Sequence, residues 1–351
     1  MSAELWQPCT SATTAMYYKL AFDEYAEATS DQPWMPDFQG HDFSFRGMPG
    51  IEAAAASGAG HLLSFKGTDT LPAIGWIEAY YGGSPADELI GTSVPATEHS
   101  VMCAGGEECE IDTFRRLLNL YPKGILSVVS DTWDFWKVVT EILPDLKDVI
   151  MARDGKLVIR PDSSPKTPVE IICGDPDAPM GSPEYHGLIY WLYRIFGGTK
   201  NSKGFIELDS HIGAIYGDSI TLAYQEEILA RLKAMGYAST NVVLGIGSYT
   251  YQYVTRDTHG IAIKATAIAK DRDNIIPIFK DPKTDNSGKK SARGLLAVNR
   301  IEGVYQLTQN ATPEDARECA FRVAYHAGKL GLHQSFSEVR KTLRDHVGGL
   351  R

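Results

Sequence analysis

Short runs of β-branched and other apolar residues recur along the chain at uneven intervals, and each run ends in a small or acidic residue. Most of the runs lack strict alternation of apolar and polar positions, which is typical of strands covered on both faces in a parallel sheet. We therefore predict buried strands at residues 61–69, 126–131, 157–162, 212–218 and 242–247.

Helical periodicity fills several of the intervals between these runs. Ile111, Phe114 and Leu118 stand three and four residues apart, and a second apolar stripe extends from Leu222 to Met235. An order of strand, helix and strand indicates βα units joined by right-handed crossovers. A (β/α) barrel is the first architecture that this order predicts, and an open doubly wound sheet is the second.

Three segments lie outside this pattern and are expected to be scaffold. Their boundaries follow from proline breaks and from an N-cap followed by proline at the first helical position. They are a helix over 10–30 that ends before Pro33 and Pro36, a Pro- and Gly-rich excursion over 163–205 with a helix around 190–196, and a helix from Thr312 towards Tyr325.

Composition restricts the classes of function. The chain has 351 residues, of which 44 are acidic and 34 basic, giving a net charge of -10, so neither nucleic acid nor an anionic membrane is an expected partner. Any anionic ligand must meet local cations. Five unevenly spaced cysteines suggest neither a disulfide framework nor a zinc site. There is no signal peptide pattern and no long apolar run, so we expect a cytoplasmic protein.

Polar residues at the ends of the predicted strands are the first candidates for chemistry. Arg160 and Asp162 stand two residues apart in an extended stretch, so they share one side of it and are able to bracket a polar ligand. The alternative is an ion pair at a strand end. Asp69 also follows a strand, either as a ligand acceptor or as an ordinary turn former.

His99 and two glycine-containing strand ends add weaker signals. His99 stands in a Pro-containing turn between Glu98 and Ser100, a setting that suits a nucleophile or a proton carrier. Gly217–Asp218 and Gly245–Gly247 permit close backbone approach to a phosphate or a ribose, but no third glycine stands at dinucleotide-binding spacing. The basic tract 280–293 is either a solvated loop or a clamp for a polyanion.

Eight motifs, read in order, carry a family resemblance. They are His41–Gly47, Phe65–Thr70, Ser93–Ser100, Ser127–Asp131, Ile159–Ser163, Gly217–Asp218, Thr255–Asp257 and Phe279–Pro282. Together they closely resemble the nicotinamide phosphoribosyltransferase family. The resemblance implies an α/β fold, an irregular (β/α) barrel of the type II phosphoribosyltransferase kind with a smaller appended α+β portion. It implies an N-terminal helical segment at 1–40 packing with the appendage, a barrel with the active site at 41–278, and a C-terminal portion with the basic loop and helices at 279–351.

The resemblance also implies an activity and its partners. The family transfers a pentosyl group: it forms nicotinamide mononucleotide and pyrophosphate from nicotinamide and phosphoribosyl pyrophosphate (PRPP) in NAD salvage. Magnesium (Mg2+) accompanies PRPP, and ATP hydrolysis is coupled to product formation. The family's active sites are shared between subunits, so we expect a homodimer.

Residue roles follow from the matching motifs. Phe43 would stack on the pyridine ring, and Asp69 would accept a hydrogen bond from the carboxamide, which disfavours nicotinate by like-charge repulsion. Arg160 would reach the amide oxygen or pyrophosphate. Asp162, Gly217 and Asp218 would hold the ribose. The further substrate-binding residues implied are Arg46, Ser93, Ser130, Gly247, Ser248, Arg256, Lys264 and Lys280.

The catalytic set implied by the resemblance is His99, Arg160, Asp162 and Asp218. His99 matches the family's phosphorylatable histidine, and Asp134 matches an acidic residue near magnesium pyrophosphate. Catalysis would come from positioning and from cations that neutralise the leaving pyrophosphate.

Two departures from the family pattern keep alternatives open. Ser248 and Tyr249 replace glycines of the family's phosphate loop. The likeness begins near Trp6, whereas the family has a substantial region before that point, so a fragment, a second polypeptide or a reduced lineage are all expected possibilities. The alternative function is a truncated, non-catalytic relative that binds nucleotide or phosphate. Nicotinate phosphoribosyltransferase is a third reading, disfavoured by Asp69.

Overall fold

The computed structural model describes residues 2–82, 86, 88–162, 166–217, 220–270, 274–279 and 291–348. The chain forms two compact units, one of Ala3–Gly260 with the segment from Ser335 onward, and one of Ile261–Gln334. The chain crosses between the two units after residues 260 and 334, whereas the sequence-based division placed boundaries after residues 40 and 278. The two units are described separately below.

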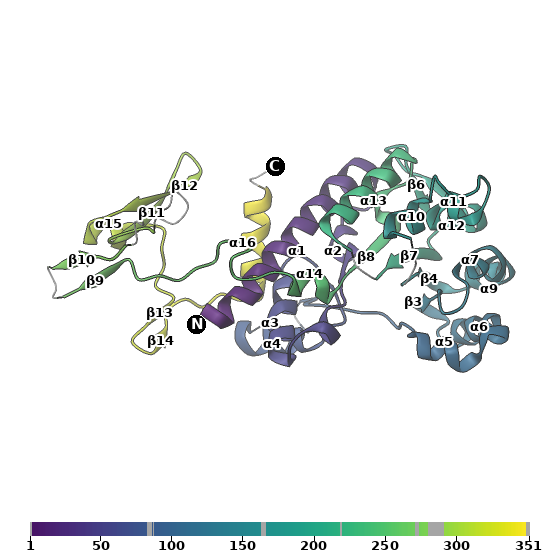
Figure 1. Ribbon diagram of the computed structural model, residues 1–351, viewed down its shortest axis with the longest axis horizontal. Helices are drawn as coiled ribbons and strands as arrows, with labels where there is room; N and C mark the ends of the chain where they lie inside the picture. Colours follow the sequence, from purple (N-terminus) through teal and green to yellow (C-terminus); the bar gives the residue numbers. More distant parts are fainter. Residues whose placement is uncertain are drawn as a thin grey trace. The chain divides into compact units, whose positions relative to one another are not determined.

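The larger unit is built on a parallel sheet of six strands in the order β2-β1-β8-β7-β4-β3 (Figure 1). The extended segment 92–97 bridges the two edges of this sheet, because Thr92 pairs with Gly67 and Ala96 pairs with Ser127, both in parallel. The sheet therefore curls into the irregular α/β barrel that was the first architecture predicted. The strands are β1 Gly40–Asp42, β2 Gly67–Thr68, β3 Lys123–Val129, β4 Asp154–Arg160, β7 Ile212–Tyr216 and β8 Val242–Ile246.

Helices cover the sheet where the sequence periodicity predicted them. The helices α6 (Glu110–Leu120), α12 (Leu188–Phe196) and α13 (Leu222–Ala234) confirm three predictions. The apolar faces of these helices and the buried residues of the strands together form the main hydrophobic core. Every residue of β7 is buried. Thr221 begins α13 as an N-cap by accepting a hydrogen bond from the Tyr224 amide.

The first helix, α1 (Ser2–Thr29), is longer than predicted and packs on the barrel. Its Tyr18 and Phe22 are fully buried in the main core. The Tyr18 hydroxyl donates to the Ile220 carbonyl over 2.9 Å, and Gln225 of α13 donates to the Tyr18 carbonyl over 2.8 Å. Figure 1 shows α1 running alongside α13.

Two predictions about elements are wrong. Residues 61–69 are not one strand: His61 ends the helix α3 (Ile51–His61), a turn follows, and only β2 is extended. The buried His61 side chain bonds the Tyr251 hydroxyl and the Gly67 carbonyl, which fixes this helix end above the sheet. The helix that begins after Thr312 is only α15 (Pro313–Glu318), because Cys319 is extended and the Ala320 amide bonds to β11.

The smaller unit consists of antiparallel pairs and one helix. The pairs are β9 (Ala267–Ala269) with β10 (Ile275–Pro277), β11 (Leu296–Ile301) with β12 (Val304–Gln309), and β13 (Tyr325–His326) with β14 (Lys329–Leu330). Its helix is α15, so this unit is of the α+β type. Within the described residues, no helix has both the length and the apolar character needed to cross a bilayer.

The larger unit contains several further helices, strands and turns. They are α2 Pro36–Gln39, α4 Pro72–Tyr81, α5 His99–Gly105, α7 Phe135–Lys137, α8 Leu143–Asp145, α9 Lys147–Met151, α10 Pro168–Cys173, α11 Pro183–His186, α14 Ser248–Gln252, α16 Phe336–Gly348, β5 Gly198–Lys200, β6 Ile206–Leu208, the 3-10 turns Phe45–Gly47, Glu107–Cys109 and Ser239–Asn241, and a π-helical stretch Val138–Ile142.

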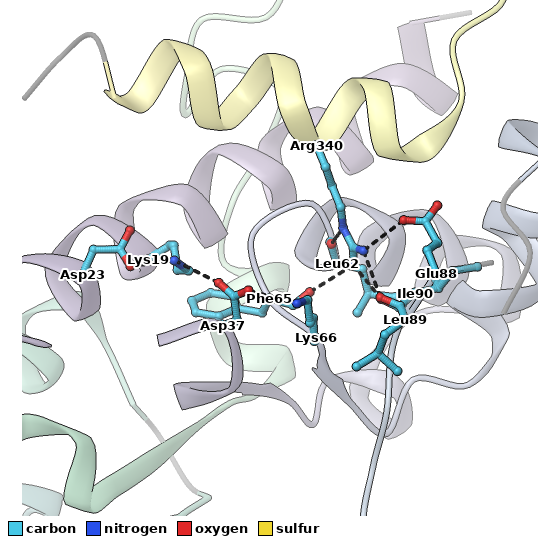
Figure 2. Close-up of polar contacts among 10 residues, drawn as sticks. All are labelled: Lys19, Asp23, Asp37, Leu62, Phe65, Lys66, Glu88, Leu89, Ile90 and Arg340. Carbon is cyan, nitrogen blue, oxygen red and sulfur yellow. Dashed lines mark hydrogen bonds and ion pairs between the residues drawn. The ribbon is translucent and has the colours of Figure 1, made fainter. Parts of the chain in front are cut away.

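Helix α16 is fastened to the barrel by one buried arginine, Arg340 (Figure 2). The guanidinium donates to the carbonyls of Leu62 over 2.8 Å and Ile90 over 2.6 Å, and it lies 3.6 Å from the Glu88 carboxylate. Burial lowers the pKa of Arg340 to about 10. The Arg340 guanidinium therefore links the turn before β2 to the residues that directly precede segment 92–97.

Replacement of Arg340 by Met should destabilise the larger unit by about 3 kcal/mol, because it leaves buried carbonyls without donors and Glu88 without its partner. Thermal unfolding followed by circular dichroism would measure the change. Arg344→Met is the matched control, since Arg344 is exposed on the same helix and its loss should cost at most about 0.5 kcal/mol. Equal losses in the two variants would contradict the role of Arg340.

Glu110 makes stability depend on pH. The residue is 3% exposed, and its Oε1 atom has no hydrogen-bond partner among the described residues. Burial raises the pKa of Glu110 to about 7, the Lys137 charge opposes this rise, and Asp134 and Glu107 add to it. The folded chain therefore holds a proton that the unfolded chain loses above its ordinary pKa of 4.5.

The free energy of unfolding should consequently fall as pH rises from about 4.5 to about 7, with the loss retained above pH 7. Glu110→Gln should match the wild type at pH 4.5 and exceed it by roughly 1 kcal/mol at pH 8. Urea titrations at both pH values would show this. A difference of the same size at both values would contradict the assignment to Glu110.

Candidate active site

A cavity of about 380 Å³ opens at the carboxyl ends of the barrel strands. In parallel α/β folds this edge is where ligands bind, because the loops that follow the strands converge there. Residues singled out by the sequence form much of the lining: Phe43, Arg46, Asp69, His99, Arg160, Asp162 and Gly217. Residues that the sequence analysis did not place in the site also line it: Phe45, Ala96, Thr97, Glu98 and Ser100.

Phe43 and Asp69 emerge side by side because the strands that carry them are adjacent and parallel. The Phe43 amide donates to the Ile246 carbonyl over 3.0 Å, and the Asp69 amide donates to the Asp42 carbonyl over 2.9 Å. A Cβ atom at Gly245 would lie 2.5 Å from the Phe43 ring. Glycine at this position therefore leaves the space that the aromatic ring occupies.

The Asp69 carboxylate is held by two neighbours. Its Oδ1 atom accepts a hydrogen bond from Ser93 Oγ over 2.6 Å and lies 2.9 Å from Nε2 of His41. Burial raises the pKa of Asp69, but the hydrogen bond and charge of His41, the Ser93 hydroxyl and the Arg160 charge outweigh burial and lower it overall. Asp69 is therefore an ionised acceptor at neutral pH.

His99 begins α5 and faces two carboxylates. Its Nε2 atom lies 3.7 Å from Asp162 and 3.9 Å from Asp131, and its Nδ1 atom lies 3.1 Å from the Thr132 hydroxyl. The side chain is 43% exposed, so it is open to a ligand in the cavity. The imidazole is thus both oriented and accessible.

Arg160 is the last residue of β4, Asp162 follows this strand, and both line the same cavity. One Arg160 Nη atom donates to the Thr97 carbonyl over 2.9 Å, while Arg160 Nε has no partner among the described residues. The Asp162 amide donates to Asp131 over 3.0 Å. Ser130 is fully buried, and its hydroxyl donates to the Val128 carbonyl.

The residues expected to bind phosphate are only partly brought together. Arg46 lines the cavity from the turn Phe45–Gly47, and a Cβ atom at Gly47 would collide with the Ser248 hydroxyl at 1.9 Å. Ser248 begins α14 directly after Gly247. The two residues that depart from the family's loop thus have different surroundings. Ser248 packs against the turn that carries Arg46, whereas the Tyr249 ring lies tilted beside the Tyr253 ring, with their centroids 4.2 Å apart.

Of the other expected cations, Arg256 and Lys264 are not among the residues that line this cavity, and Lys280 cannot be placed. Arg256 is exposed and pairs with Asp257 over 3.1 Å. Lys264 belongs to the smaller unit. Asp218 and Lys280 lie outside the described residues.

The Asp134 carboxylate accepts a hydrogen bond from the Lys137 amide over 3.0 Å and so caps α7. The described part of the chain has no cluster of three or more His, Cys, Asp or Glu side chains suited to a metal ion. The role expected for Asp134 stays a prediction.

The residues that sequence reasoning missed mostly flank the ones it found. Ala96, Thr97, Glu98 and Ser100 belong to the motif that supplied His99, and Phe45 belongs to the motif that supplied Phe43. The motif boundaries were therefore a sufficient signal for them. His41 begins the motif that supplied Phe43, but its contact with Asp69 could not be predicted, because that contact depends on the register of β1 and β2.

Comparison with known proteins agrees with this geometry. A protein of Acinetobacter baylyi named nicotinamide phosphoribosyltransferase is 48% identical over 99% of this chain and 69% of its own length. Proteins with the same name from Mycoplasma pneumoniae and Xanthomonas campestris pv. campestris are 40% and 36% identical. The chain covers 63% of the Mycoplasma protein and 69% of the Xanthomonas protein, or about two thirds of the length of these relatives.

The family model described as the nicotinate phosphoribosyltransferase (NAPRTase) family matches residues 38–323, a range that contains the whole cavity lining. The α/β barrel, the cavity at its carboxyl edge and this match agree with one another. The chain belongs to the nicotinate phosphoribosyltransferase family.

Proposed function

We propose that this chain acts as a nicotinamide phosphoribosyltransferase, which joins nicotinamide to the ribose of PRPP and releases pyrophosphate. The observation that carries the proposal is the cavity itself, which combines an aromatic ring and an ionised carboxylate with two guanidinium groups. The names of the similar proteins support the same reaction. The proposal includes a place in NAD salvage.

Base selectivity would come from Asp69. A carboxamide N–H donates to an ionised carboxylate, whereas the carboxylate of nicotinate would be repelled by it. The Phe43 ring beside Asp69 would stack on the pyridine. The amide form of the base is therefore the substrate that this end of the cavity fits.

The reaction needs little acid or base. Departure of pyrophosphate leaves oxocarbenium-like character at the ribose C1 atom, and the pyridine nitrogen attacks from the opposite face. Asp162 would orient the ribose hydroxyls, and Asp218, Ser130 and Gly217 are proposed to act with it. Arg46 and Arg160 would neutralise the leaving group as negative charge develops on it.

The remaining components are proposals that rest on the family resemblance. Magnesium would enter on the pyrophosphate oxygens of PRPP as part of the substrate, with no reaction step assigned to a protein ligand. ATP would phosphorylate His99, whose exposed imidazole lies near two carboxylates. Arg256, Lys264 and Lys280 are proposed phosphate contacts, and a homodimer and a cytoplasmic location are proposed as well.

Asp69→Asn should lower the preference for nicotinamide over nicotinate by at least about tenfold, because it removes the charge that repels nicotinate. The ratio of kcat/KM for the two bases, measured with the purified chain, PRPP and magnesium, would report it. Asp209→Asn, at the opposite end of the barrel before β7, is the matched control. An unchanged ratio in Asp69→Asn would refute the role given to Asp69.

His99→Ala should abolish the stimulation of turnover by ATP and leave the slower ATP-independent reaction within about threefold of wild type, because positioning and charge neutralisation remain. Nicotinamide mononucleotide formation with and without ATP is the measurement. Loss of both reactions in a folded variant would contradict a coupling role. A folded wild-type chain that binds nicotinamide mononucleotide without any turnover would favour the non-catalytic alternative.

A further inference from the structure

His41 is a polar residue held close to Asp69 at the base end of the cavity, and the proposed function gives it no role. Its side chain is 12% exposed, whereas that of Asp69 is 43% exposed, so the histidine lies behind the carboxylate. Parallel pairing of β1 with β2 sets His41 opposite Gly67, two residues before Asp69. The backbone register thus fixes the approach of the imidazole to the carboxylate.

The contacts of His41 reach both groups proposed to recognise the base. Its Nε2 atom lies 2.9 Å from Asp69 Oδ1, and its ring lies 4.7 Å from the Phe43 ring, centroid to centroid. Asp69 is ionised and can only accept, so Nε2 carries the proton of this hydrogen bond. Ser93 donates to the same Oδ1 atom over 2.6 Å.

Two donors on one carboxylate oxygen have a geometric consequence. They fix the plane of the Asp69 carboxylate and leave Oδ2 as the oxygen available to a ligand N–H. Without His41 the carboxylate would be able to rotate about its last bond, and the Phe43 ring would lose a neighbour that limits its tilt. Both losses would act on the base and not on the ribose or the phosphates.

We infer that His41 is a positioning residue that sets the preference for a carboxamide base over a carboxylate base, by orienting the Asp69 carboxylate and supporting the Phe43 ring. This inference rests on the proposed function. It assigns selectivity to a residue that acts through Asp69 and Phe43 without needing to touch the substrate.

Gly67 pairs with His41 across β1 and β2, and its substitution tests the position of the imidazole independently. A Cβ atom at Gly67 would lie 2.7 Å from His41 Nδ1, so Gly67→Ala must displace the imidazole while leaving His41, Asp69 and Phe43 chemically intact. Loss of selectivity in Gly67→Ala would therefore trace to the position of the ring and not to its removal.

Binding of the two mononucleotides tests the inference apart from turnover. Calorimetry would compare nicotinamide mononucleotide with nicotinate mononucleotide on wild type, His41→Leu, His41→Gln and Gly67→Ala, with PRPP as a probe of the phosphate end. We expect the preference for nicotinamide mononucleotide to fall about tenfold in His41→Leu and in Gly67→Ala, while PRPP affinity stays within about twofold. Glutamine can place a donor near the position of Nε2, so His41→Gln should recover most of the preference.

His211→Leu is the matched control. His211 forms the same kind of pair with Asp209 at 2.7 Å, but ahead of β7 at the opposite end of the barrel, so its loss should leave the preference unchanged. In the enzyme assay His41→Leu should raise KM for nicotinamide by about tenfold with a smaller change in kcat.

Three results would overturn the inference. One is an unchanged preference in His41→Leu, and another is an equal loss of affinity for both mononucleotides and PRPP, which indicates a general structural role. The third is failure of His41→Gln to recover any preference while it stays folded. A wild-type chain that binds neither mononucleotide would instead overturn the proposed function, and this inference with it.

Discussion

Closure of the barrel by segment 92–97 is the constraint on which the rest of the larger unit depends. The strands are parallel, so the curled sheet brings the carboxyl ends of all its strands to one rim. Segment 92–97 joins β2 to β3 and places Ser93 beside Asp69 and His99 beside Asp162. Without these bridges, the base end and the His99 end of the cavity would belong to opposite edges of an open sheet.

Arg340 also holds segment 92–97, through a residue that precedes it. Arg340 binds the Leu62 and Ile90 carbonyls, which precede β2 and segment 92–97 (Figure 2). Asp69 directly follows β2, and Ser93 is the second residue of segment 92–97. The hydrogen bond between Asp69 and Ser93 thus spans two strands whose entries share one guanidinium. A helix from the C-terminal part of the chain thereby supports the geometry of a cavity on the opposite rim.

Sequence reasoning worked where burial alone determines structure. The apolar runs ending at Asp131, Asp162 and Gly247 correspond to β3, β4 and β8, because strands buried on both faces have a pattern that few alternatives share. It failed at His61, where the apolar run combines a helix end with a turn and a short strand. It also left His41 without a role, since a contact between adjacent strands depends on register, which composition and periodicity do not specify.

The two ends of the cavity differ in the charged groups that line them. Asp69 at the base end is ionised, its Oδ1 atom is paired and its Oδ2 atom is open to a ligand, so an uncharged amide donor suits it. Among the described lining residues, the carboxylates of Asp69, Glu98 and Asp162 outnumber the guanidinium groups of Arg46 and Arg160 by one. A lining that is nearly balanced in charge cannot hold a diphosphate by its own cations, because each added anionic oxygen would exceed the available positive charge. Magnesium carried on the pyrophosphate would reduce that excess, and cations from outside this lining would reduce it further.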